Sequence, residues 1–454
     1  MVISLAAAVQ QREREDLAYR VLNAELDVAL LKLFLFFFLG SIFFSGILPA
    51  AGTIRSGSLA LAVAISFIRV TRKRMRIILL PAGVFLLVFL VFAVANRGEA
   101  LLVGSDRSWL YTFTLTLLLG IFLRADSAQW AITIVKDIAL FSVIHAAATL
   151  FFLVVPNVYS DWFKPHFYAN VRTAQNYKAG LTSHYSTNGM YLAWGLISSY
   201  FLSCCAAKRR GWLVCAGFVL LALLATTKRA HLLFGIAACF SIYFLFNRNR
   251  GSVTKWFKFL TALLAAAIVM YVFSLYIPEL AGVLTRLQGA ELDDGRSSYY
   301  TICLDMWRRA PFFGGGWNSF TKTLYQSGIS DLSRLYTNNN LSQNAHNVYL
   351  QLLAEEGLFG FVLFLLVAGG GLLRSIKSAL TSCDSGAGAP QQVALSTLSV
   401  AVQMFFFLYC LTGNSLYEVA EYAVYILVGL PSARLFVSSV GAFESRELKT
   451  HGAK

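Results

Sequence analysis

Long apolar runs alternate with short polar loops along most of the chain, and this alternation predicts a polytopic membrane protein. A membrane-spanning helix needs about 20 mostly apolar residues. On this criterion we expect about twelve spans, at residues 31–50, 58–70, 77–94, 109–123, 131–155, 190–205, 212–226, 230–246, 259–277, 347–373, 393–412 and 422–438. The run at 58–70 is short, so we expect it to extend into its neighbours. The predicted fold class is an all-α polytopic membrane protein.

The loops between the runs indicate how the chain is oriented. Cytoplasmic loops carry an excess of Lys and Arg. Three loops are basic: Arg72, Lys73, Arg74 and Arg76; Lys208, Arg209 and Arg210; and Arg248, Arg250, Lys255 and Lys258. With the N-terminus inside, all three loops fall in the cytoplasm, and the same count of spans places the C-terminus inside.

Two long polar segments then fall outside. The predicted organisation is a cytoplasmic segment at 1–30, helices one to nine within 31–277 with an outer loop at 156–189, a large extracytoplasmic loop at 278–346, helices ten to twelve within 347–438, and a cytoplasmic tail at 439–454. We expect a bacterial cytoplasmic (inner) membrane protein that crosses the bilayer many times.

The composition excludes a soluble enzyme. The 454 residues are 57% hydrophobic and 13% charged, with a mean hydropathy of +0.63, whereas ordinary globular domains are about 25% charged. A net charge of +15 would suggest nucleic acid in a soluble protein. Here the basic residues lie mostly in short loops between apolar runs, so we expect no nucleic-acid partner. The seven cysteines include no CxxC pair, and those within apolar runs are interpreted as small buried hydrophobes.

A basic pair interrupts the apolar pattern between the runs at 212–226 and 230–246. Lys228 and Arg229 fall in a tight turn that the predicted topology places outside, against the positive-inside trend. Arg229 is either a snorkelling residue at a helix end or part of an anion site. Arginine suits an anion site because its planar fork can bind two phosphate oxygens at once.

Arg296 and His346 are the other residues that could carry chemistry. Arg296 opens a stretch whose apolar residues Tyr299, Ile302, Cys303 and Met306 recur at helical spacing. This spacing predicts a helix on the membrane face, with Arg296 as a solvated charge or an anion ligand. His346 lies where the large loop meets an apolar run, and it is either structural or a general base, since its unperturbed pKa is near 6.5.

Four acidic residues leave two interpretations each. Asp293 and Asp294 could bind a metal, but they have no second acidic cluster outside and are better interpreted as a solvated loop. Glu355 and Glu356 fall within a predicted span, where carboxylates are functional candidates unless they bond a neighbouring helix. The sequence therefore predicts neither a metal site nor a cofactor.

Three stretches, with the turn Lys228-Arg229-Ala230, resemble a known signature. They are Gly295–Trp307, Ala310–Phe320 and the run from Ala345-His346-Asn347-Val348-Tyr349-Leu350 to Gly357-Leu358-Phe359-Gly360. Together they resemble the O-antigen ligase and O-antigen polymerase superfamily. The resemblance covers roughly residues 225–370, and the N-terminal half is similar in hydropathy alone.

The resemblance implies a function. Members are all-helical, similar to C-type glycosyltransferases, and move a glycan from a polyprenyl-diphosphate (undecaprenyl-diphosphate) carrier to an acceptor hydroxyl on the outer face of the membrane. Their transfer is thought to need no metal. By motif position Arg229 and Arg296 would hold the diphosphate, and His346 would act as base or orient the acceptor. Lys228, Asn347 and Tyr349 are secondary candidates from the same motifs.

The segment Gly180–Gly189 departs from many family members through its His-Tyr-Ser-Thr insert. This departure favours polymerases of exopolysaccharide or capsule over ligases. His184 and Asn188 are therefore secondary candidates, either for glycan contact or for packing of the loop.

We expect an inverting, metal-independent transferase whose partners are a carrier-linked glycan donor, a glycan or lipid-linked acceptor, and the bilayer. Polymerase and ligase differ only in the acceptor, and the sequence contains no clean discriminator between them. The alternative from another class is a polytopic transporter or flippase for a lipid-linked or anionic substrate. Transporters often contain internal repeats, and we find none in this sequence.

Overall fold

The computed structural model describes residues 25–73, 76–79, 87–92, 95, 104–168, 176–206, 208–247, 296–327, 344–381, 389–430 and 437–440. Within these ranges, seven helices are long and apolar enough to cross a membrane. They are Glu25–Phe43, α2 (Ala51–Arg72), Ser108–Asp126 of α4 (Gly104–Asp126), α5 (Gln129–Val154), α9 (Arg229–Phe246), α15 (Val348–Thr381) and Gln392–Cys410 of α16 (Ala389–Cys410). The chain is thus a multi-pass membrane protein, although seven candidate spans do not confirm the twelve that we predicted.

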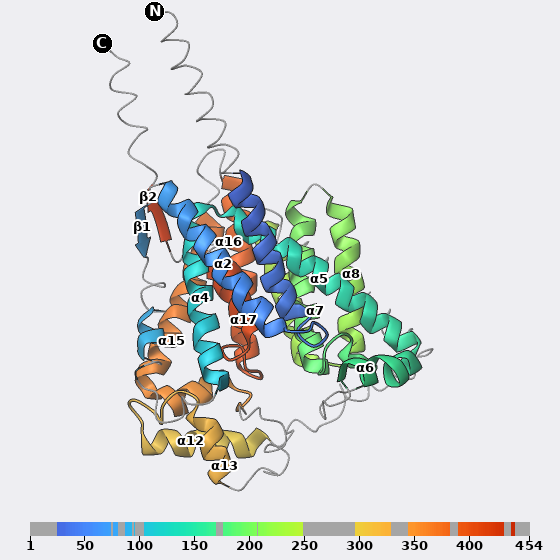
Figure 1. Ribbon diagram of the computed structural model, residues 1–454. Helices are drawn as coiled ribbons and strands as arrows, with labels where there is room; N and C mark the ends of the chain where they lie inside the picture. Colours follow the sequence, from blue (N-terminus) through green and yellow to red (C-terminus); the bar gives the residue numbers. More distant parts are fainter. Residues whose placement is uncertain are drawn as a thin grey trace, which may run out of the picture.

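The other elements complete a helical bundle (Figure 1). Between α5 and α9 lie η2 (Val158–Phe163), α6 (Lys164–Tyr168), η3 (Tyr177–Ala179), α7 (Tyr185–Cys205) and α8 (Arg209–Ala225). After α9 come α12 (Arg296–Arg309), α13 (Ser319–Gln326), α17 (Val419–Val424) and η4 (Tyr425–Gly429). The predicted helix beginning at Arg296 is confirmed, and the predicted run at 58–70 does extend, into α2.

Two predicted spans need correction. Residues 76–79 and 437–440 fall at the ends of the predicted spans 77–94 and 422–438, yet they form strands β1 (Arg76–Leu79) and β2 (Val437–Val440). The strands pair antiparallel, with Arg76 opposite Val440 and Leu79 opposite Val437. The described residues are mostly helical, as predicted, and this strand pair is a local exception, because short β-branched segments can satisfy their backbone groups by pairing with each other. The predicted span 259–277 lies outside the described residues.

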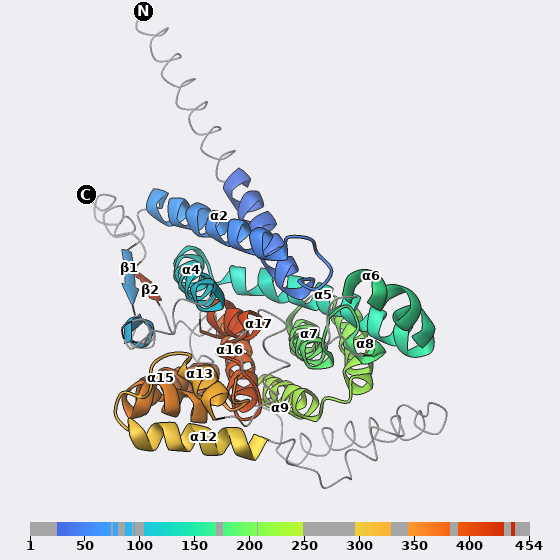
Figure 2. The same cartoon turned by 60° about the horizontal axis from the view of Figure 1, so that its bottom comes forward.

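The helix α16 lies at the centre of the bundle, where it contacts α7, α9, α15, α17 and η4 (Figure 2). Of the apolar window in α16, 78% is buried, against 28% in α2 and in α9. The helices α12 and α13 lie across one end of the bundle, and β1 and β2 lie at the opposite end (Figure 1). We call the first of these the α12 end.

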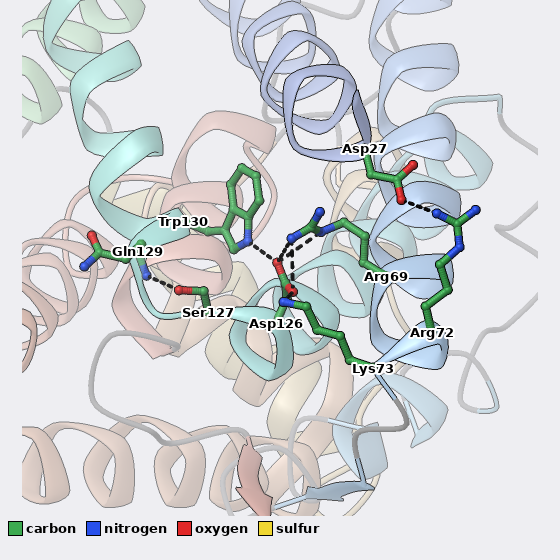
Figure 3. A network of polar contacts seen from close by, with 8 residues as sticks. All are labelled: Asp27, Arg69, Arg72, Lys73, Asp126, Ser127, Gln129 and Trp130. Carbon is green, nitrogen blue, oxygen red and sulfur yellow. Dashed lines mark hydrogen bonds and ion pairs between the residues drawn. The ribbon is translucent and has the colours of Figure 1, made fainter. Parts of the chain in front are cut away.

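An ion-pair network joins four helices at the end opposite α12 (Figure 3). The carboxylate of Asp126, at the end of α4, accepts from Arg69 Nη2 at 3.0 Å and Trp130 Nε1 at 2.8 Å, and it also pairs with Lys73. Arg72 pairs with Asp27 on the first described helix. Two cations of the predicted basic cluster are therefore bound to carboxylates, and they fix α2 against its neighbours.

The helix α15 is interrupted at Gly357, where φ is 62°. An interruption in an apolar helix leaves carbonyl and N–H groups that lipid cannot satisfy. The segment 311–316, after α12, supplies their partners: Gly315 N to Ala354 O (2.9 Å), Gly316 N to Glu355 O (2.7 Å), Leu358 N to Pro311 O (2.9 Å) and Phe359 N to Phe312 O (3.1 Å). Four backbone bonds therefore attach the segment that follows α12 to α15.

This backbone contact predicts that Gly357→Ala is strongly destabilising. An added Cβ would lie 2.4 Å from Phe312 O, and φ is positive at this residue. We therefore expect the free energy of unfolding to fall by at least about 2 kcal/mol. The measurement is thermal unfolding of the purified protein in detergent. Gly369→Ala is the matched control, because it lies in the same helix with nothing within 4 Å of an added Cβ. Equal unfolding temperatures for the two variants would contradict the proposed contact.

Candidate functional site

His346 lies in a turn that is fixed immediately before α15. Its φ is 56°, in the left-handed region that few non-glycine residues adopt. The Gln351 side chain holds the preceding residues, accepting from Ala345 N at 2.9 Å and donating to Asn344 Oδ1 at 3.1 Å. After the turn, Asn347 caps the helix by accepting from Leu350 N at 3.1 Å. His346 therefore lies in a turn that side-chain hydrogen bonds hold on both sides.

The loop between α16 and α17 holds both His346 and Arg296. Asn414 Nδ2 lies 3.3 Å from His346 Nδ1, and it lies 3.5 Å from Glu418 Oε1. Two residues earlier, Thr412 O accepts from Arg296 Nη1 at 3.2 Å. A single short loop thus sets the position of the imidazole relative to the guanidinium at the start of α12.

The basic turn before α9 lies against the start of α7. Lys228 Nζ is 3.9 Å from the centre of the Tyr185 ring, a cation–π contact. Gly189 allows this approach, since an added Cβ there would lie 3.2 Å from Lys228 Cβ. The ring of His184 stacks on Tyr185, with centroids 4.8 Å apart, and His184 caps α7 by accepting from Ser186 N.

Electrostatics links these residues into one site. Burial, then the charges of Arg296 and Lys228, then His184, lower the pKa of His346 to about 4. Burial and the charge of Lys228 lower the pKa of His184 to about 4 as well. Both imidazoles are therefore neutral at pH 7, and the site is positive through its lysine and arginine.

Of the eight residues nominated from the sequence, His184, Lys228, Arg296 and His346 come together in this way. Arg229 is the first residue of α9, beside Lys228, and its side chain is exposed. The other three make packing contacts. Asn188 is buried and donates to Thr149 Oγ1 and Lys178 O, Asn347 caps α15, and Tyr349 donates to Phe407 O at 2.9 Å.

Glu355 is buried at the centre of a hydrogen-bond network rather than open to a substrate. It accepts from Tyr417 Oη at 2.7 Å, from Phe320 N at 3.2 Å and from Gln351 Nε2 at 3.1 Å. These partners belong to three segments, so the carboxyl joins the α12–α13 region, α15 and the α16–α17 loop. Of the two interpretations made from the sequence, bonding to neighbouring elements is the one that these contacts match.

Sequence reasoning missed Thr412, Asn414 and Glu418. A signal for two of them was present, because Asn414 and Glu418 are four residues apart next to an apolar run and can therefore share a face. The partner of Arg296 is the backbone carbonyl of Thr412. Every residue type has such a carbonyl, so the sequence gives no signal for this contact. Among the described residues, no group of three or more His, Cys, Asp or Glu could hold a metal ion, and Asp293 and Asp294 lie outside those ranges.

Residues 186–365 match the family model described as O-antigen ligase. The matched region contains all six residues that the motifs nominated, namely Lys228, Arg229, Arg296, His346, Asn347 and Tyr349. This match supports the similarity to the O-antigen ligase and O-antigen polymerase superfamily that the motifs predicted. No curated protein matches the chain. The family match begins earlier in the chain than the predicted resemblance, and it includes Gly189 of α7, which lies against Lys228.

Proposed function

We propose that this protein is a membrane glycosyltransferase that moves a glycan from a polyprenyl-diphosphate carrier to an acceptor hydroxyl, as a surface-polysaccharide polymerase or an O-antigen ligase. The observation that carries the proposal is the site itself. Arg296, Lys228 and a neutral His346 lie together at the α12 end of a bundle of apolar helices. A lipid-linked diphosphate needs a binding site of this kind, with cationic side chains at the membrane surface.

The proposed reaction is a displacement at the anomeric carbon of the donor glycan. The acceptor oxygen forms a bond to that carbon as the bond from the carbon to the phosphate oxygen breaks. The electron pair leaves with the diphosphate, and the acceptor hydroxyl loses its proton. Attack opposite the leaving group inverts the anomeric configuration.

Each site residue has a proposed role in this displacement. Arg296 and Arg229 bind the diphosphate and stabilise its growing negative charge, as preorganised donors do in other enzymes. Lys228 adds charge from its fixed position over Tyr185. His346 takes the acceptor proton or orients a substrate. His184 and Asn188 remain proposals for glycan contact, although Asn188 is buried.

The experiment is a transfer assay with the purified full-length protein. The donor is the polyprenyl-diphosphate-linked glycan extracted from cells that make the polysaccharide, and the acceptors are the same material and a lipid A core. Longer carrier-linked glycan indicates a polymerase, and glycan on lipid A indicates a ligase. Activity in EDTA is expected to be retained, and NMR of the product is expected to show an inverted anomer. If glycan is transferred to neither acceptor, the proposal is overturned.

The proposed topology places the α12 end outside the cytoplasmic membrane. Lys322 on α13 is exposed at this end, so Lys322→Cys is expected to react with an impermeant maleimide in intact cells. The six described native cysteines are free, so all seven native cysteines must first be replaced by alanine. Labelling that requires permeabilised cells would reverse the proposed orientation of the site.

A transporter or flippase for a lipid-linked substrate is the second candidate. It would also use cations at the membrane edge, but it would release its substrate unchanged. Reconstituted vesicles that carry labelled donor separate the two functions: movement of intact donor across the bilayer supports the transporter, and new glycosidic bonds support the transferase.

A further inference from the structure

The Asn414 amide lies between His346 and Glu418, at the junction of α16 and α17. Its nitrogen is 3.3 Å from His346 Nδ1 and 3.5 Å from Glu418 Oε1. An amide nitrogen carries two N–H groups and accepts no hydrogen bond. One N–H can therefore point to the imidazole and the other to the carboxyl.

This arrangement determines where the neutral imidazole carries its proton. Since Asn414 donates, Nδ1 of His346 must accept, and the single ring proton then lies on Nε2. Glu418 keeps the amide in this orientation when ionised, because a carboxylate only accepts and would repel the amide oxygen. Burial raises the pKa of Glu418 to about 7, and its bond with Asn414 favours the ionised form.

The cations around His346 keep its imidazole neutral, and they favour an anionic ligand at this site. The charged and titratable groups that act on His346 are Arg296, Lys228 and His184, together with Glu418 through Asn414. Nε2 of His346 has no partner within the described part of the chain. A donor nitrogen among cations suits a phosphate oxygen, whereas a base there would have to take up a proton against those same positive charges.

We propose that Asn414, oriented by Glu418, fixes the proton of His346 on Nε2, so that His346 donates a hydrogen bond to the diphosphate of the donor lipid instead of acting as the base. Asn414 and Glu418 are positioning residues, and the inference rests on the proposed transferase function. As the bond from the anomeric carbon to the phosphate oxygen breaks, the electron pair moves onto that phosphate and strengthens the Nε2–H bond. The acceptor hydroxyl passes its proton to water.

The test reverses the proton position without removing His346. In the double variant Asn414→Asp with Glu418→Gln, the new carboxylate accepts from Nδ1–H, so Nε2 becomes an acceptor. Glu418→Gln alone is the reference, because it removes the like charge and keeps Asn414. For a donor role, we expect kcat to fall by about 10²-fold relative to this reference. For a base role, the carboxylate would raise the basicity of Nε2, so an unchanged or higher kcat would overturn the proposal.

A second measurement does not depend on transfer. Nitrogen NMR of full-length protein labelled at histidine reports which ring nitrogen carries the proton, and His346→Gln identifies the signal of His346. We expect a protonated Nε2 in the wild type and a protonated Nδ1 in the double variant. A wild-type ring with Nε2 unprotonated at pH 7 would overturn the assignment even if the double variant failed to fold. A protein with the expected tautomer but no transferase activity would instead reject the proposed function.

The pH profile separates the donor role of His346 from the base role. A protonated imidazole still donates from Nε2, so a donor predicts no acid limb of kcat/KM from His346. A base predicts a fall as the pH drops toward about 4, the pKa of this residue. Such a limb in the wild type that is missing from His346→Gln would overturn the proposal.

Discussion

Arg296→Ala is expected to lower glycan transfer by about 10²–10³-fold, the loss typical when a fixed donor to a developing negative charge is removed. The guanidinium is held by Thr412 O at 3.2 Å, close enough to His346 to lower the pKa of its ring. It is thus preorganised where the diphosphate would leave. The measurement is kcat for carrier-linked donor with purified protein, together with donor binding.

Two further variants make this result specific. Arg309→Ala is the matched control, because Arg309 is exposed at the far end of the same helix, and we expect its kcat to stay within about twofold, as is usual for surface substitutions. Arg296→Lys is expected to recover only part of the activity, because an ammonium lacks the planar fork. Full activity in Arg296→Ala would remove this residue from the diphosphate site. Arg229→Ala applies the same test to the exposed arginine of the basic turn.

His346→Ala is the second large effect, with an expected loss in kcat of about 10²–10⁴-fold, the range for a positioned proton-transfer or hydrogen-bonding group. The turn around His346 is held by Gln351 and Asn347, neither of which bonds to the imidazole. The variant is therefore expected to fold, and donor binding is expected to weaken by less than tenfold, because the arginines carry the diphosphate.

Amide substitutions separate the roles of this histidine. His346→Gln, which retains an N–H donor, is expected to recover more kcat than His346→Ala if the ring donates a hydrogen bond. Equal losses in the two variants would favour a base. His166→Ala is the control, because His166 is an exposed histidine on α6. A comparable loss in His166→Ala would mean that the assay reports general damage.

Local patterns in the sequence predicted the membrane class of this protein, one of its helices and its superfamily. Long apolar runs predicted a multi-pass membrane protein because lipid accepts only helices whose backbone bonds are satisfied within the segment. The spacing of Tyr299, Ile302 and Met306 predicted α12, and the side chains of Ile302 and Met306 are indeed buried. Motifs around Arg229, Arg296 and His346 predicted the superfamily that the family model confirms.

Tertiary structure decided what local pattern could not. The pairing of β1 with β2 joins segments more than 350 residues apart, and no local periodicity reports such a contact. The structural roles of the motif residues Glu355 and Gly357 depend on the backbone of residues 311–316, which bonds to the interrupted part of α15. Arg296 and His346 come together in one site because Thr412 and Asn414, which contact them, lie two residues apart on a loop between two later helices. The sequence by itself determined which residue types could do the chemistry, since hydropathy and motif spacing are local properties. The tertiary structure decided which of them meet, because hydrogen bonds and charges act over a few ångströms in space, whatever the distance along the chain.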